Sequence, residues 1–219
     1  MKIIELKETV TASNDRDAQV LREELRAKGT LLINLMASPG AGKTTLLERT
    51  IRDLKETLRI AVMEADVDSD VDAVRIEKIG AKAVQAHTDG MCHMDAGMTR
   101  RALEGLGEEQ FDLVVLENVG NLICPAEFDT GAGKCVMLLS VPEGDDKPLK
   151  YPLMFSVCDV LLITKTDVLP YFDFDVDACI ARAKKLNPGI TVFTVSAKTG
   201  DGFTAWETWL KKAVQDWKA

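Results

Sequence analysis

Residues 37–45, with the sequence ASPGAGKTT, constrain the fold of this chain more than any other feature. They follow an apolar run at 31–36 that is typical of a buried parallel strand, and a helix is predicted from residue 43 to about residue 58. Glycines placed between a strand and a helix let consecutive backbone N–H groups turn toward a phosphate, and the N-terminus of the helix favours an anion. The segment fits the phosphate-loop pattern except that Ala37 occupies the first glycine position. The residues expected to hold the phosphates are Gly40, Ala41, Gly42, Lys43, Thr44 and Thr45.

Two side chains of this loop have a predicted chemical role. The Lys43 ammonium would neutralise the β- and γ-phosphate oxygens, and the Thr44 hydroxyl would ligate Mg²⁺. A glycine turn that carries Lys-Thr by chance is the competing explanation. The predicted strand before the loop and the predicted helix after it argue against that explanation.

Strand and helix patterns alternate along the rest of the chain. An opening helix is expected to be capped by Asn14 and Asp15 and to end at Gly29. Further strands are expected at 60–64, 83–86, 113–116, 135–141, 160–164 and 190–195. Further helices are expected at 71–79, 96–106, 176–186 and 203–217, with a polar loop at 142–150. The alternation predicts an α/β fold with a three-layer, mainly parallel sheet. We expect a single domain over 1–219, with 1–29 as a helical extension packed on it.

Two later segments indicate which base is bound. Thr164-Lys165-Thr166-Asp167 resembles the guanine-reading motif of GTPases, in which the aspartate accepts hydrogen bonds from guanine N1–H and the 2-amino group. Adenine lacks this pair of donors, so the contact would discriminate. Each of the two segments is weak evidence by itself. Found together, in this order after a phosphate loop, they favour GTP over ATP. The later segment resembles the motif that supports guanine O6, and it comprises Ser196, Ala197 and Lys198.

Acidic residues follow two of the predicted strands. Asp66 comes soon after the 60–64 strand and is predicted to orient the attacking water or a Mg²⁺-bound water. The other aspartates of 66–72 are expected to form a solvated loop. Glu117 follows the 113–116 strand as a predicted Mg²⁺ group, and Gly120 is the predicted γ-phosphate sensor. Phosphoryl transfer to water needs positioning and charge neutralisation rather than a covalent nucleophile.

Cys92, His93 and Cys124 are candidate ligands for Ni²⁺ or Zn²⁺, which prefer thiolate and imidazole. Cys92 and His93 are expected at the start of a helix, and Cys124 comes after the Glu117 strand. From the residues alone, a buried thiol and an ordinary surface histidine are the commoner explanation. The remaining cysteines are expected to pack in the core, and they are Cys135, Cys158 and Cys179.

Composition limits the classes of partner and the compartment that we expect for this chain. The formal net charge of −8 disfavours nucleic acid, because phosphate backbones select basic surfaces. The N-terminus lacks the apolar region of a secretory signal, and no apolar run approaches the roughly 20 residues that span a bilayer. Five cysteines are an odd number, which argues against a disulfide framework. We therefore expect a cytoplasmic protein that binds neither nucleic acid nor membrane.

Over nearly its whole length the chain resembles the HypB family, the GTPases that assist nickel insertion into nickel–iron hydrogenase. The residues that carry the resemblance are 34–48 (NLMASPGAGKTTLLE), 72–76 (DAVRI), 92–96 (CHMDA), 117–125 (ENVGNLICP) and 167–173 (DVLPYFD). The resemblance implies a phosphate-loop GTPase of the class that dimerises around nucleotide, with GTP or GDP and Mg²⁺ bound. It also implies a Ni²⁺ or Zn²⁺ site near the dimer interface, with Cys92, His93 and Cys124 as ligands. The implied partners are a second copy of the chain, a nickel metallochaperone and the precursor of the hydrogenase large subunit.

Two departures from the family pattern limit what the resemblance implies. No cysteine or histidine precedes His87, so an N-terminal nickel site of the kind that some members carry is not expected. Thr164 stands where asparagine is usual, which lowers the expected guanine affinity. Three alternatives are a urease-type nickel-insertion GTPase, a nucleotide kinase with structural cysteines, and a binding module without hydrolysis. The urease type is disfavoured because its Cys-Pro-His arrangement is missing here.

Overall fold

Seven parallel strands form one sheet in the order β3-β2-β4-β1-β5-β6-β7. The computed structural model describes the backbone of residues 6–66 and 71–219 and the side chains of residues 11–65 and 73–219. The strands are β1 (Leu31–Ala37), β2 (Ile60–Asp66), β3 (Lys82–His87), β4 (Leu113–Glu117), β5 (Lys134–Ser140), β6 (Val160–Thr164) and β7 (Thr191–Thr194). The predicted parallel α/β fold is confirmed.

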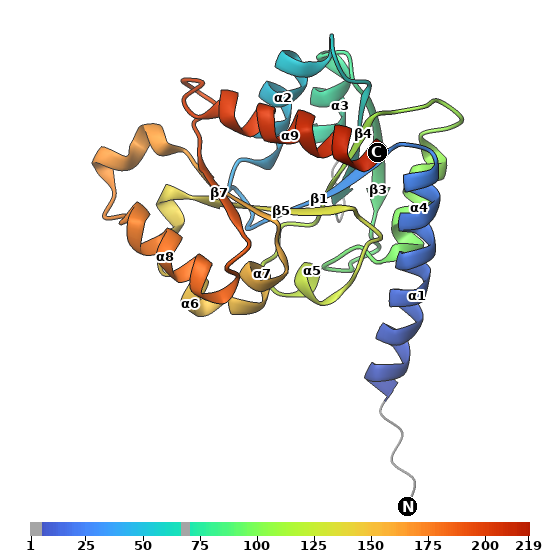
Figure 1. Cartoon of the computed structure of the whole chain (residues 1–219), viewed down its shortest axis with the longest axis horizontal. Helices are drawn as coiled ribbons and strands as arrows, with labels where there is room; N and C mark the ends of the chain where they lie inside the picture. Colours follow the sequence, from blue (N-terminus) through green and yellow to red (C-terminus); the bar gives the residue numbers. More distant parts are fainter. Residues whose placement is uncertain (1–5, 67–70) are drawn as a thin grey trace, which may run out of the picture.

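Helices cover both faces of this sheet (Figure 1). The α-helices are α1 (Leu6–Ala27), α2 (Lys43–Leu54), α3 (Val71–Lys78), α4 (Ala96–Gly105), α5 (Cys124–Glu127), α6 (Lys147–Lys150), α7 (Pro152–Val157), α8 (Val176–Leu186) and α9 (Phe203–Lys218). Two 3₁₀ helices are η1 (Val141–Glu143) and η2 (Thr166–Tyr171). Among the described residues, no helix combines the length and the apolar character needed to cross a bilayer.

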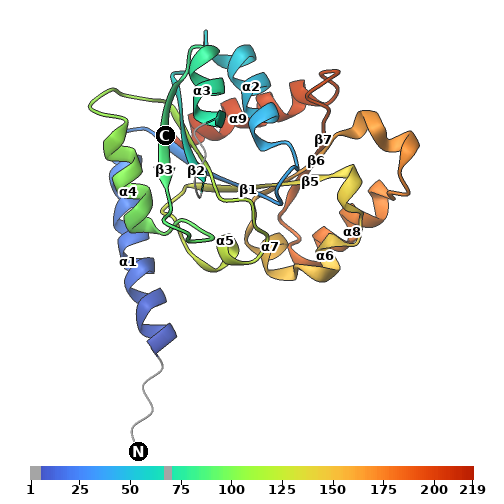
Figure 2. The same cartoon turned by 180° about the vertical axis from the view of Figure 1, so that it is seen from behind.

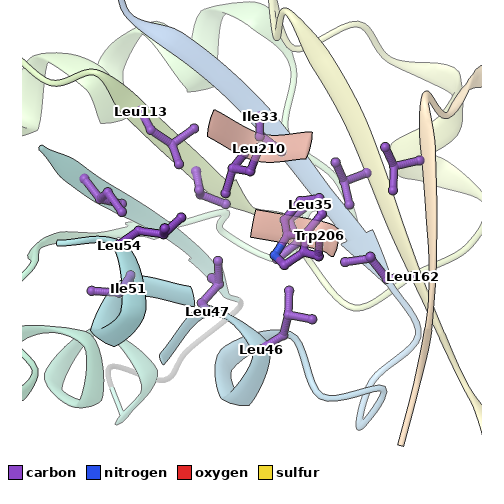
Figure 3. Packing of buried hydrophobic residues seen from close by; sticks show 14 of the residues in the cluster. Ile33, Leu35, Leu46, Leu47, Ile51, Leu54, Leu113, Leu162, Trp206 and Leu210 are labelled. Carbon is purple, nitrogen blue, oxygen red and sulfur yellow. The ribbon is translucent and has the colours of Figure 1, made fainter. Parts of the chain in front are cut away.

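The central strand β1 is buried on both faces, which is why its sequence is a nearly continuous apolar run. Ile33 and Leu35 point toward α2 and α9, where they join Trp206 in one core cluster (Figure 3). Leu32 and Met36, with the opposite parity, join the clusters of the other face. Alternation along one strand thus packs helices on both sides and places the end of β1 at the middle of the sheet edge.

The opposite face is covered by α1 and α4 at one end and by α7 and α8 at the other. Helix α1 lies alongside α4, and its N-terminal part projects away from the body (Figures 1 and 2). Leu21 and Leu25 of α1 are buried in the same cluster as Leu106, just beyond α4. These contacts fix the C-terminal half of α1 against the sheet.

Two predicted helix starts were wrong. Asn14 and Asp15 do not cap α1, which begins at Leu6. The Asn14 side chain hydrogen-bonds to other segments instead, so it is not available to the N–H groups of its own helix. Cys92 and His93 do not begin a helix either, because they lie in the turn before α4, and Asp95 is the residue that caps it through the Met98 N–H.

The predicted loop at 142–150 contains short helices. Glu143 accepts hydrogen bonds from both the backbone N–H and the hydroxyl of Ser140, which closes the turn η1. Pro148 lies in the first turn of α6, where its missing N–H costs nothing. Short helices of this kind carry too little apolar periodicity to be predicted from sequence.

Candidate nucleotide and metal site

The loop between β1 and α2 has the geometry of an anion cradle. Gly40 and Gly42 have φ angles of 75° and 100°, which L-residues with side chains rarely adopt. Gly42 precedes α2, so the free N–H groups of the first helical turn face the loop. The Lys43 side chain is 10% exposed, and its Nζ lies 3.9 Å from Glu117 Oε1. The loop thus presents backbone donors and one ammonium to a single cavity.

This phosphate cavity measures about 560 Å³ and is polar. The Thr44 hydroxyl donates a hydrogen bond to Glu117 Oε1 at 3.1 Å, so two of the predicted Mg²⁺ groups are in contact. Asp66 is the last residue of β2, but its side chain lies outside the described part. The lining residues of the cavity are Pro39, Gly40, Gly42, Lys43, Thr44, Thr45, Glu64, Ala65, Arg75, Glu117, Asn118, Val119, Gly120 and Lys165.

Sequence reasoning missed two charged residues of this cavity. Glu64 is 4% exposed and pairs in register with Glu117 across β2 and β4, which brings two carboxylates to one place. Two neighbouring carboxylates favour a cation between them. Arg75 of α3 also lines the cavity, with its Nε 2.9 Å from Glu48. Glu64 carries the same signal as Asp66, an acidic residue at a strand end.

Gly120 lies directly against the phosphate loop. A Cβ atom at this position would be 3.0 Å from the Pro39 Cγ and 3.1 Å from its nitrogen, so a side chain would push the two segments apart. Asn118 fixes the same segment to β1, because its N–H donates to the Leu35 carbonyl and its Nδ2 donates to Asn34 Oδ1. The loop after β4 is therefore held in contact with the nucleotide site.

The predicted base-reading residues surround a second cavity, of about 240 Å³. Asp167 accepts a hydrogen bond from the Ser196 hydroxyl at 2.7 Å, while Ala197 and Lys198 line the wall. Thr164, which replaces the usual asparagine, donates to the Ala41 carbonyl at 2.8 Å. Lys165 donates to the Gly40 carbonyl at 2.7 Å. The two cavities share Gly42, Thr45 and Lys165, so they form one elongated site.

Cys92, His93 and Cys124 form a cluster in which one ligand atom of each lies within 4.8 Å of the others. Cys92 and His93 come from the turn before α4, and Cys124 is the first residue of α5. The His93 ring is 7% exposed and stacks on Phe128, with centroids 3.8 Å apart. Two thiols and one imidazole at this spacing fit a borderline ion such as Ni²⁺ or Zn²⁺.

The surroundings of the cluster affect the protonation of its ligands. Burial lowers the pKa of His93, which keeps the imidazole neutral at pH 7 with a lone pair for a metal. The two largest effects on the pKa of the Cys92 thiol both raise it: the larger is a hydrogen bond with Cys124, and the smaller is burial. A bound cation would replace the thiol protons, since metals bind the thiolate form.

Comparison with known proteins relates this chain to one group. A family model described as the CobW/HypB/UreG nucleotide-binding domain matches residues 31–194. The hydrogenase maturation factor HypB of Rhizobium leguminosarum bv. viciae is 45% identical over 210 residues, which are 96% of this chain and 70% of that protein. The crystal structure of HypB from Helicobacter pylori in complex with nickel has a TM-score of 0.88 at 37% identity, over 93% of this chain and 96% of that one. HypB from Archaeoglobus fulgidus gives a TM-score of 0.86 at 39% identity, over 93% and 99%.

Proposed function

Because this chain belongs to the HypB family of hydrogenase maturation factors, we propose that it hydrolyses GTP and thereby controls delivery of Ni²⁺ to a nickel–iron hydrogenase precursor. The observation that carries the proposal is the segment 117–124. Its first residue, Glu117, accepts a hydrogen bond from Thr44 in the phosphate cavity, and its last, Cys124, belongs to the Cys-His-Cys cluster. A shift of this segment between nucleotide states would move a metal ligand.

The hydrolytic roles that we propose belong to the phosphate loop and to the ends of β2 and β4. Lys43 neutralises the phosphate oxygens, and the Gly120 backbone N–H reports whether a γ-phosphate is present, since Gly120 lines the phosphate cavity and lies against Pro39 of the loop. Thr44, Asp66 and Glu117 are the residues that would hold Mg²⁺, which supplies further charge neutralisation when bound. Asp66 orients the attacking water. The products are GDP and phosphate.

Asp167 makes the nucleotide GTP rather than ATP. Its carboxylate lines the second cavity beside Ala197 and Lys198 and is oriented by the Ser196 hydroxyl. Two acceptor oxygens match the N1–H and 2-amino donors of guanine. An adenine in the same place would leave the Asp167 carboxylate without the two donors that guanine supplies.

Asp167→Asn is expected to weaken GTP binding by about 10–100-fold, because a neutral amide replaces two charge-assisted hydrogen bonds. The same variant should bind xanthosine triphosphate better than the wild type does, since xanthine presents a carbonyl where guanine has its amino group. Competition with a fluorescent GDP analogue measures both affinities. Equal GTP affinity in the two proteins would remove Asp167 from base recognition.

The coupling of the two sites has a direct test. We expect the Ni²⁺ affinity of the protein to differ by about tenfold between GDP and a non-hydrolysable GTP analogue, a usual size for coupling between sites. The two states should also differ in the fraction of homodimer, measured by light scattering with and without Ni²⁺. Identical Ni²⁺ affinity and identical dimer fraction in both nucleotide states would exclude the switch. The partner that receives or supplies the ion is a nickel metallochaperone of the maturation system.

A further inference from the structure

The three ligands of the Cys-His-Cys cluster come from two segments that are distant in the sequence. Cys92 and His93 lie in the segment 92–96, which leads into α4, and Cys124 begins the segment 124–129. The strands that precede them, β3 and β4, are not neighbours in the sheet, because β2 lies between them. Something outside the sheet must therefore hold the two segments at a fixed spacing.

Asn14 of α1 contacts both segments with its one amide group. Its Nδ2 donates to the Asp129 carbonyl at 2.9 Å, at the end of the segment 124–129. Its Oδ1 accepts from the Ala96 N–H at 2.9 Å, at the end of the segment 92–96. One side chain thus bridges the backbone of the two segments that carry the metal ligands.

Helix α1, which carries Asn14, is itself held in place by other contacts. Arg22, two turns further along, binds both carboxylate oxygens of Asp129 at 2.6 and 2.7 Å and donates from Nε to the Ala132 carbonyl. The adjoining part of α1 is anchored in the core by Leu21 and Leu25 and runs beside α4 (Figure 2). The helix cannot drift away from either segment without breaking these contacts.

The spacing of the segments matters for metal binding. Bonds of about 2.0–2.3 Å in a tetrahedral arrangement require ligand atoms roughly 3.5–3.8 Å apart. The ligand atoms of the cluster already lie within 4.8 Å of one another, so side-chain movements of about 1 Å reach that separation while the backbone of the two segments stays in place. Phe128 lies in the segment 124–129 and stacks on His93, so this segment also sets the orientation of the imidazole.

We propose that Asn14 is a positioning residue for the metal cluster: it clamps the segments 92–96 and 124–129 at the spacing that Ni²⁺ requires. This inference rests on the proposed function, in which the cluster binds Ni²⁺. Asn14 does not touch the ion. It sets the affinity by holding the backbone from which Cys92, His93 and Cys124 project.

Asn14→Ala tests the clamp without weakening α1, because alanine favours a helix interior more than asparagine does. We expect the Kd for Ni²⁺ to rise by about tenfold or more, as for other groups that orient metal ligands. The thiolate-to-nickel absorption spectrum at saturation should also change. Asn14→Asp retains the acceptor for the Ala96 N–H but loses the donor to Asp129, and it should weaken binding as well. Competition with a chromogenic chelator, with Ni²⁺ as the only added metal, measures each Kd.

Glu24→Gln is the matched control. It removes the ion pair between Glu24 of α1 and Arg100 of α4. This pair also links α1 to α4, but it does not contact the segment 92–96 or the segment 124–129. Its Ni²⁺ affinity and spectrum should equal those of the wild type, and circular dichroism and thermal unfolding show that each variant is folded. Wild-type affinity and spectrum in Asn14→Ala would overturn the clamp alone, as would an equal loss in Glu24→Gln. A wild-type protein that binds no Ni²⁺ would overturn the proposed function and the clamp with it.

Discussion

Lys43→Ala is expected to lower the rate of GTP hydrolysis by about 10²–10³-fold, the usual cost of removing one preorganised group that stabilises transition-state charge. The Lys43 side chain is only 10% exposed in the phosphate cavity, so water cannot take over its stabilisation of the phosphate charge once the ammonium is removed. The chain as a whole carries a net charge of −8, which makes this local cation more important for holding a polyphosphate. Release of inorganic phosphate at saturating GTP and Mg²⁺, without any phosphate acceptor, measures the rate.

Lys212→Ala is the control for this experiment, since it removes one ammonium from the exposed face of α9, where Lys212 pairs with Asp216. Its hydrolysis rate should equal that of the wild type. Lys43→Ala with a rate within about threefold of the wild type would show that this loop does not carry the chemistry. A wild-type protein that binds GTP but releases no phosphate would be a binding module instead.

The local parts of the nucleotide site could be predicted because each depends on one short stretch of sequence. The strand, glycine loop and helix around Lys43 are contiguous, and the geometry of Gly40 and Gly42 follows from the residue type. Asp167 and Ser196 are separated by 29 positions, yet each follows a strand. Since β6 and β7 are parallel neighbours, their carboxyl ends meet at one place.

The parts that depend on tertiary pairing could not be predicted in this way. Glu64 meets Glu117 only because β2 lies beside β4, and no local pattern specifies that neighbour. Asn14 does not cap α1, although an asparagine before a helical run usually caps the helix. Its actual partners lie 82 and 115 residues away, and both are backbone atoms, so their residue types give no signal.

The metal cluster could be predicted only in part from the sequence. Cys92 and His93 are adjacent, but from sequence alone a Cys-His pair with a distant cysteine is more often structural. The structure brings one ligand atom of each residue to within 4.8 Å, because the carboxyl ends of β3 and β4 lie at the same edge of the sheet and Asn14 bridges the segments that follow them. What sequence could not supply is Phe128, whose stacking on His93 depends on the path of the short helix α5.

Cys124→Ser is expected to lower the Ni²⁺ affinity by about 10²-fold or more. A four-ligand zinc site provides about 10–16 kcal/mol in total, so one soft ligand accounts for roughly 3 kcal/mol. A serine hydroxyl stays protonated at neutral pH and is a poor ligand for this ion. The competition assay with a chromogenic chelator measures the loss, and the thiolate-to-nickel absorption should fall with it.

Cys179→Ala is the matched control, because it removes a cysteine on the buried face of α8, where burial raises the pKa of the thiol to about 12. Such a thiol stays protonated and should not contribute to Ni²⁺ binding, so the affinity should not change. Unchanged affinity in Cys124→Ser would place the ion elsewhere and break the link through the segment 117–124. Cys124 ends the segment that Glu117 begins, so its loss should also abolish any effect of Ni²⁺ on GTP hydrolysis while the metal-free rate persists. Loss of the metal-free rate would show instead that the substitution damages the phosphate cavity.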